Sequence, residues 1–239
     1  MKTGSISLLK EQSRGALEGR WGESVAYPAV LIALHMIAAA ILAAVMKSAS
    51  VAEVISGAGI AFIMQVLISL FVWGAGYHFL QMLRGRETSF SSLLTVFRMQ
   101  PDRFVLFGII SGAVRIIPMV PFLIALGQIK DHPLAAVISA VIGAALFIAA
   151  ILFLLTYAMT VFVLLDCGGS LPTTVAMKQS RRLMRGQKWK FFLTCISFIG
   201  WVLLAVITLG LGLLWIIPYV ITTMCAFYES TEKGPDMSR

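Results

Sequence analysis

The sequence predicts an all-α integral membrane protein that crosses the lipid bilayer six times. Of its 239 residues, 59% are hydrophobic and only 13% are charged, whereas a soluble domain carries about 25% charged residues. The apolar residues are also gathered into blocks of about 20 or more, which is the helix length that spans a bilayer core of roughly 30 Å. Because helices of soluble proteins usually keep one polar face, such uniformly apolar blocks favour the membrane.

Four apolar blocks have the length of one crossing each, and a fifth block, residues 191–228, is too long for one. Two glycines near its middle, within residues 208–212, favour a tight turn. We therefore divide this block into two short spans, with one tilted helix plus an interfacial segment as the alternative. The predicted spans are residues 27–46, 54–80, 104–127, 134–165, 191–208 and 212–228, which form one domain over 26–229 between cytoplasmic segments 1–25 and 230–239.

Basic residues are distributed unevenly over the segments between these spans. Lysine and arginine accumulate on the cytoplasmic side of membrane proteins. The chain has nineteen lysines and arginines, and six crossings place sixteen of them on one side of the membrane. The opposite side has Lys47 and Lys130, and Arg115 falls within a span. This distribution predicts cytoplasmic N- and C-termini, although the two basic residues of the tail do not by themselves decide between six spans and five.

A secretory signal peptide is an alternative interpretation of the N-terminal region, since residues 48–50 resemble a cleavage site of small residues. However, about 26 residues precede the first apolar block, and three of them are glutamates. The block is also longer than the apolar region of a signal peptide. We therefore expect an uncleaved membrane anchor.

Three cytoplasmic segments have the pattern of short amphipathic helices: residues 5–20, 89–98 and 171–185. The last of these has a proline suited to the first helical turn and is followed by Gly186, which suits a helix end. The apolar face predicted for the middle segment comprises Phe90, Leu93, Leu94 and Phe97. Such helices either lie on the membrane surface against acidic headgroups or pack against the ends of neighbouring spans, and the sequence supports both interpretations.

Each of these segments precedes a pair of spans, which indicates a possible three-fold repeat. Residues 12–14 and 179–181 both read Gln-Ser-Arg, and in both cases a glycine, Gly19 or Gly186, lies seven positions after the glutamine. The middle unit lacks this motif. Because chance also produces such similarities, the repeat is a hypothesis.

The densest run of basic residues lies in the third amphipathic segment and at the start of the fifth span. The net charge is +8, which in a soluble protein would suggest nucleic acid, but the position of these charges between spans favours anionic lipid headgroups. We predict that this region binds such lipid or a membrane partner, and no nucleic acid. The residues of this predicted interface are Lys178, Arg181, Arg182, Arg185, Lys188, Trp189 and Lys190.

Three polar side chains are expected near the middle of their spans: His35, Gln65 and Arg115. A charge at the bilayer centre costs at least about 2.5 kcal/mol, so Arg115 should face protein or water. Pro118 and Pro121 follow it and should break or kink the third span. Either these side chains are isolated helix-contact groups, with Arg115 reaching an interface, or they form a polar cavity that binds an anionic group at Arg115.

No catalytic or metal-binding motif is present in the sequence. It lacks HExxH, GxSxG, GxxxxGK[ST] and a glycine-rich dinucleotide loop, and no carboxylate lies in the middle of a span. The cysteines Cys167, Cys195 and Cys225 have no metal-ligand spacing and are interpreted as small buried hydrophobic residues. We therefore expect no enzymatic activity, no metal and no cofactor.

A dense set of aromatic, glycine and basic residues occupies the last third of the chain. It comprises residues 182–184, Gly186, 188–192, 197–201, 208–210, 214–215, 218–219 and 226–228, and residues 16–22 match the opening of the same pattern. This set resembles the bacterial membrane family called domain of unknown function 975, densely over residues 178–229 and loosely elsewhere. The resemblance implies a multi-pass protein of the bacterial cytoplasmic membrane and brings no catalytic residues.

Three hypotheses for the function remain from the sequence. The first is a non-enzymatic membrane protein that binds anionic lipid or a membrane partner through its basic cytoplasmic helices. The second is a transporter or permease component with a polar site around Arg115. The third, an intramembrane enzyme, lacks the nucleophile or metal set that it requires. Glycines such as Gly74 and Gly108 permit close helix contacts within one chain and equally in a homo-oligomer.

Overall fold

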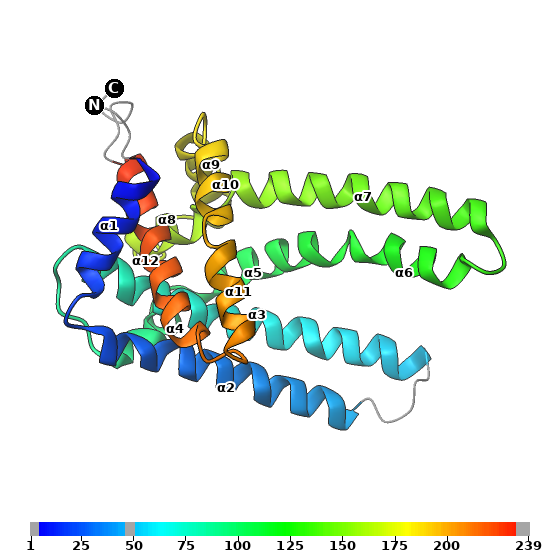
Figure 1. Cartoon of the computed structure of the whole chain (residues 1–239), viewed down its shortest axis with the longest axis horizontal. Coiled ribbons are helices and arrows are strands. Elements are labelled where there is room, and N and C mark those ends of the chain that lie inside the picture. The colour runs from blue at the N-terminus through cyan, green and yellow to red at the C-terminus, as the bar shows by residue number, and fades with distance from the viewer. Residues whose placement is uncertain (1–4, 46–50, 233–239) are drawn as a thin grey trace.

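A computed structural model describes residues 5–45 and 51–232 of the chain, without the side chains of 51–55. Within these ranges all regular structure is helical, and the predicted all-α class is confirmed (Figure 1). Six helical stretches are long and apolar enough to cross a membrane, as predicted. They are Trp21–Val45, Ser56–Leu83, Pro101–Gln128, Pro133–Asp166, Lys188–Ile207 and Leu213–Glu232.

The chain is organised as three consecutive units, each with a short helical segment followed by a helical hairpin. The first unit consists of α1 (Ile6–Leu17), α2 (Trp21–Val45) and α3 (Val51–Leu83). The second consists of the 3-10 helix η1 (Phe90–Leu94), α4 (Thr95–Arg98), α5 (Pro101–Ile116), α6 (Met119–Gln128), α7 (Pro133–Thr156) and α8 (Thr160–Asp166). The third consists of α9 (Thr173–Leu183), α10 (Lys188–Ile196), α11 (Ile199–Ile207) and α12 (Leu213–Glu232). This order of elements agrees with the hypothesis of a three-fold repeat.

Further agreement with the repeat comes from the two Gln-Ser-Arg sequences. Ser13 and Ser180 are both completely buried. Gly19 and Gly186, which follow α1 and α9, both have φ of +75°. This is the left-handed backbone conformation that glycine adopts most readily at a helix end. The same local structure therefore ends the short helix of the first and third units.

Breaks within the long apolar stretches have two different causes. Pro118 separates α5 from α6, which confirms the break expected in the third span. No proline lies between α7 and α8. There the Ser180 hydroxyl of α9 accepts the backbone N–H of Met159 at 3.2 Å and donates to the carbonyl of Thr156 at 3.3 Å. A side chain from another element thus satisfies the backbone groups that this second break leaves open.

The last apolar block is divided where the glycines lie. Helix α11 ends at Ile207 and α12 begins at Leu213. In the turn, Leu209 has φ of +52° and Gly210 has φ of +90°, and Leu209 is 95% exposed. The two-helix interpretation of residues 191–228 is therefore the one that the structure adopts.

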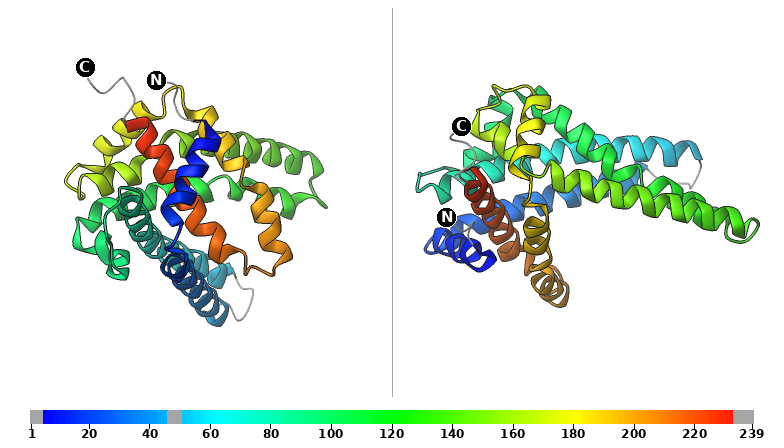
Figure 2. Two further views of the ribbon diagram at one scale, coloured as in Figure 1. Left: turned by 60° about the vertical axis from the view of Figure 1, so that its left-hand side comes forward. Right: turned by 90° about the horizontal axis from the view of Figure 1, so that it is seen from above.

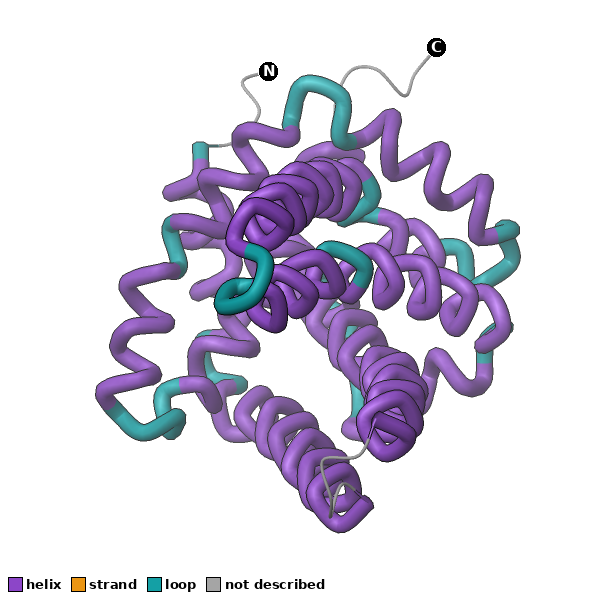
Figure 3. The backbone as a smooth tube through the Cα atoms, turned by 90° about the vertical axis from the view of Figure 1, so that its right-hand side faces the viewer, coloured by secondary structure: helices purple, strands orange, loops and turns teal. Residues whose placement is uncertain are grey.

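The hairpins share a base but do not all point the same way. The hairpins α2–α3 and α5–α7 extend along the long axis, whereas α10–α12 lies across their base (Figures 1 and 2). Viewed along the long axis, the chain is a set of helices joined by short loops (Figure 3). Large apolar side chains such as Leu126 (67% exposed) and Val141 (63%) remain open along the second hairpin. An apolar exterior of this kind suits lipid rather than water.

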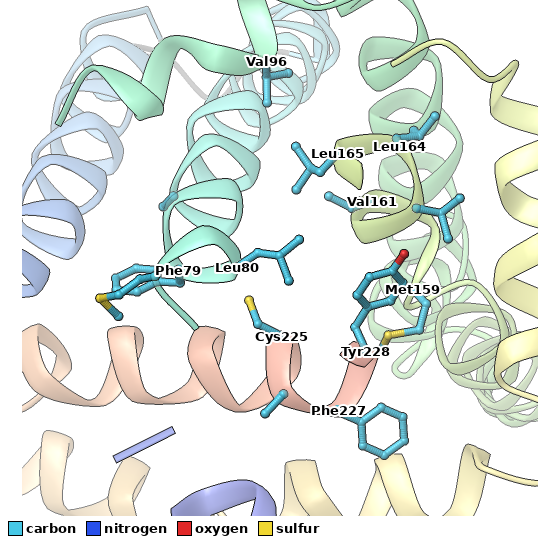
Figure 4. Close-up of a cluster of buried hydrophobic side chains, with 14 of the residues drawn as sticks. Phe79, Leu80, Val96, Met159, Val161, Leu164, Leu165, Cys225, Phe227 and Tyr228 are labelled. Atoms are coloured by element: carbon cyan, nitrogen blue, oxygen red, sulfur yellow. The ribbon is translucent and has the colours of Figure 1, made fainter. Parts of the chain in front are cut away.

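The hydrophobic core lies at the base, where the ends of α3, α8 and α12 meet. Leu80, Leu164 and Cys225 are completely buried there, and Figure 4 shows side chains of α3, α8 and α12 around the same space. The short helices also pack on this base, as the burial of Leu9 and Leu17 in α1 and of Met184 after α9 shows. Packing against the ends of the hairpins is thus part of the role of these segments.

The single α-helix predicted for residues 89–98 is not formed, and only one of the four apolar residues predicted to share its face is buried. Only Leu93 is buried, together with Val96, whereas Phe90, Leu94 and Phe97 are 49%, 45% and 39% exposed. The reason is that residues 90–94 form a 3-10 helix, whose three residues per turn place side chains in different directions from an α-helix.

This 3-10 helix lies very close to α3 at Gly74. A Cβ atom added there would be only 2.1 Å from the backbone oxygen of Leu93. We expect Gly74→Ala to lower the free energy of unfolding in detergent by about 1–3 kcal/mol, because the helices must separate. Gly59→Ala, in the same helix with no atom within 4 Å of its added Cβ, should be neutral or stabilising. Equal stability of both variants would contradict the close contact.

Labelling of the α11–α12 turn tests whether the third hairpin crosses the membrane. In a chain whose native cysteines are replaced by alanine, we expect a cysteine at Leu209 or Lys130 to react with a membrane-impermeant thiol reagent in intact cells. A cysteine at Arg182 should react only after permeabilisation. If the cysteine at Leu209 also requires permeabilisation, the third hairpin does not cross, and the six-span topology is wrong.

Candidate functional site

The three predicted mid-span residues do not form a common cluster of contacts. His35 lies in α2, Gln65 in α3 and Arg115 in the last turn of α5, and all three side chains are exposed. The Nδ1 atom of His35 lies 2.8 Å from the carbonyl oxygen of Leu31 in its own helix. Within the described residues, no hydrogen bond or ion pair joins any two of the three. A shared polar site around Arg115 therefore stays a prediction.

The predicted basic interface is built on a helix with two different faces. One face of α9 is held in the base, where Thr173 donates to the carbonyl of Arg103 at 2.9 Å and Ser180 bonds to the α7–α8 break. Ala176 and Leu183 are buried on the same face. The opposite face exposes the side chains of Lys178, Arg181 and Arg182, and Arg185 is exposed in the turn that follows; we call these four residues the basic face.

No member of the basic face is paired with a carboxylate in the part of the chain that the structure describes. Trp189, in the first turn of α10, is 68% exposed beside it. Lys190 differs from the prediction, because its Nζ atom is inaccessible to solvent and lies 5.5 Å from the ring centroid of Phe227. The basic face and Trp189 thus point outward, whereas Lys190 points into the base.

A cluster of ion pairs around Arg84 lies at the centre of the base, and the sequence did not reveal it. Arg84, directly after α3, donates through Nη1 to Oδ1 of Asp166 and through Nε to Oε1 of Glu229, both at 2.5 Å. Its Nη2 lies 3.7 Å from Oε2 of Glu232. Tyr228 donates its hydroxyl to the second oxygen of Asp166 at 3.1 Å. Together these residues form the Arg84 cluster, which joins the end of every hairpin.

The ion pairs of the Arg84 cluster are partly buried, and water therefore screens the attraction between their charges less than at an open surface. The side chains of Arg84 and Asp166 are each 21% exposed and that of Glu229 is 12% exposed. The hydrogen bond to Asp166, followed by that to Glu229, raises the pKa of the Arg84 guanidinium further above its usual value, against the opposing effect of burial. Arg84 is therefore a permanent positive charge that holds three carboxylates together.

Sequence separation explains why this cluster was missed. Asp166 and Glu229 lie 82 and 145 positions after Arg84, and neither belongs to a local motif. The one available signal was the repeat, since Arg84, Asp166 and Glu229 each lie at the end of the last helix of their unit.

A second polar cluster lies between α2, α3 and the loop before η1. The hydroxyl of Tyr27 and that of Thr88 lie 2.7 Å and 2.6 Å from Nδ1 of His78. The rings of Tyr27 and His78 are stacked with centroids 4.1 Å apart. Although His78 is only 3% exposed, it lines a groove of about 470 Å³ that reaches the surface. No group of three or more potential metal-ligating side chains occurs among the described residues.

Among the described residues, six helices have the length and apolar composition of membrane spans, and their ends meet in one buried core, an arrangement consistent with an α-helical membrane protein. The family described as "Protein of unknown function (DUF975)" matches residues 3–234, nearly the whole chain, and the chain belongs to this family. The resemblance seen in the sequence is therefore confirmed and extends well beyond residues 178–229. No curated protein and no solved structure matches the chain.

We expect Arg84→Leu to lower the free energy of unfolding by about 3 kcal/mol, because it leaves three carboxylates together without their cation. Arg86→Leu is the matched control: Arg86 is exposed and donates to Gln81 alone, so its loss should change stability by less than about 0.5 kcal/mol. Denaturation of both variants in the same detergent measures the difference. Equal stabilities would show that the Arg84 cluster does not hold the hairpins together.

Proposed function

We propose that this chain is a non-enzymatic integral membrane protein that binds anionic lipid headgroups through the basic face of α9. It would be a multi-pass protein of the bacterial cytoplasmic membrane, with both termini and the short helices on the cytoplasmic side. The single observation that supports lipid binding best is the two-faced structure of α9. Buried hydroxyls fix one side of the helix to the base, and on the other side lie four exposed cations that are paired with no carboxylate of the described residues.

The position of α9 in the chain supports this proposal. Residue Lys188, only five positions after α9 ends, begins an apolar stretch long enough to cross the bilayer. A helix so close to the start of a span lies at the depth of the headgroups. The exposed ring of Trp189 suits the same depth, since its apolar body and its N–H group prefer the membrane interface.

The attraction between the basic face and anionic headgroups determines how strongly the lipid should bind. A lysine or arginine near an anionic membrane surface contributes about 1 kcal/mol, and the contribution falls as salt increases. The rigid attachment of α9 lowers the conformational cost of presenting these charges together. A membrane protein with an acidic cytoplasmic surface is the alternative partner for the same face.

The test uses the full-length protein in a non-ionic detergent, titrated with phosphatidylglycerol or phosphatidylcholine. We expect phosphatidylglycerol to bind more tightly, with Arg182→Gln weakening its binding about five-fold, the equivalent of about 1 kcal/mol. Lys130→Gln removes one equally exposed charge from the α6–α7 turn and should leave binding unchanged. Native mass spectrometry of retained lipid measures both effects.

Equal affinity for the two lipids, or an equal loss in both variants, would rule out recognition of anionic lipid by the basic face. If Arg182→Gln instead removes a co-purifying membrane protein without changing lipid binding, the face has a protein partner.

A further inference from the structure

A groove of about 470 Å³ lies at the start of α2, on the base but apart from the basic face. Three segments distant in sequence form it: the α1–α2 junction, the last turns of α3 and the loop before η1. Its polar lining comprises Arg20, Glu23, His78, Glu87 and Thr88. None of these residues belongs to the Arg84 cluster.

One part of the groove has the chemistry of an anion site. The first intrahelical hydrogen bond of α2 runs from the N–H of Ser24 to the carbonyl of Arg20. Within the described residues, the N–H groups of Trp21, Gly22 and Glu23 therefore have no backbone partner at the positive end of a 25-residue helix. Arg20 forms no ion pair within the described residues, directly precedes α2 and lines the groove.

His78 contributes a further hydrogen-bonding atom to the groove. Its Nδ1 atom is occupied by Tyr27 and Thr88, but its Nε2 atom has no hydrogen-bond partner in the described part of the chain. The residue is 97% buried and lines the groove. In the tautomer in which Nδ1 accepts from one of these two hydroxyls, the ring proton lies on Nε2, where an acceptor in the groove can bind it.

The carboxylates restrict which anion fits. Glu23 and Glu87 line the same groove, and neither is joined to a cation by an ion pair among the described residues. A simple anion would be repelled by both. A ligand that has a positive group as well as a negative one satisfies the whole lining, with its anion at Arg20 and the helix start and its cation at the glutamates.

The depth of the groove adds a further restriction. Helix α2 begins at Trp21 as an apolar stretch long enough to cross the bilayer. The groove therefore lies where the bilayer meets water, which is the depth of phospholipid headgroups. Headgroups of this region contain phosphate esters, and some of them also contain a primary amine.

We propose that this groove binds a phosphate ester that carries a primary amine. Two sources share this chemistry: the headgroup of an ethanolamine phospholipid and a soluble molecule such as glycerophosphoethanolamine. Arg20, the α2 N-terminus and His78 hold the phosphate, while Glu23 and Glu87 hold the ammonium group. This site is separate from the basic face of α9 and does not depend on lipid binding there.

The main experiment measures binding of three probes to the full-length protein in detergent: glycerophosphoethanolamine, short-chain phosphatidylethanolamine and inorganic phosphate. Binding of the soluble phosphoamine indicates that the headgroup chemistry suffices, and binding of the lipid alone indicates that the acyl chains are needed as well. We expect Arg20→Gln to weaken every probe about ten-fold, since it removes charge-assisted hydrogen bonds to phosphate. Glu87→Gln should weaken only the two amine-bearing probes.

Gly22→Leu gives a test that leaves all charges in place. A Cβ at Gly22 meets no atom within 4 Å, and the same holds for Gly15 in α1, which does not line the groove. Gly22→Leu should fill the groove and reduce binding at least about ten-fold, whereas Gly15→Leu, with the same side-chain change in a neighbouring helix, should bind normally. Matching thermal midpoints would show that both variants are folded.

Two outcomes would overturn the proposal. One is the absence of binding by both amine-bearing probes at millimolar concentration. The other is binding that Gly22→Leu and Glu87→Gln leave unchanged, which would place the ligand elsewhere. Neither outcome affects the proposed lipid binding at α9, because that binding is measured with phosphatidylglycerol and the Arg182→Gln variant.

Discussion

The ion pairs of the Arg84 guanidinium are the interaction on which the arrangement of the hairpins depends. The guanidinium lies at the end of the first hairpin and bonds to carboxylates at the ends of the other two, Asp166 and Glu229. Removing such charges from water is costly, and only close pairing offsets the cost. The geometry of the pairs therefore fixes how the three hairpin ends meet, and the apolar core of Phe79, Leu164 and Phe227 is packed around them.

A fixed base allows the surrounding short helices to present charged surfaces. Helix α9 is bonded through Ser180 to the break between α7 and α8, so that one helix completes that break and, with the turn that follows it, exposes four cations. The start of α2 is held by the stacked pair of Tyr27 and His78, which leaves its first backbone N–H groups open to the groove. Both proposed binding surfaces thus include charged side chains that form no ion pair among the described residues.

The hairpins themselves have a simpler chemistry. Their outer surfaces expose leucine, isoleucine and valine in large numbers, as at Leu126 and Val206, and polar contacts between helices are concentrated at the base. In lipid such a surface costs little, because acyl chains are as apolar as the side chains. The position of α10–α12 across the base (Figure 1) follows from the packing of α12 against α1, α2 and α3.

Local features of the sequence determined the helices, their breaks at Pro118 and at the 208–212 turn, the basic run at 178–190 and membership of the family. These follow from hydropathy, glycine, proline and charge, whose effects act within one or two helical turns. Only the tertiary structure decided that residues 90–94 form a 3-10 helix against Gly74, that Lys190 points inward, and that Arg84 meets carboxylates up to 145 positions away. Contacts of that kind depend on how separate hairpins pack, and no local pattern encodes them.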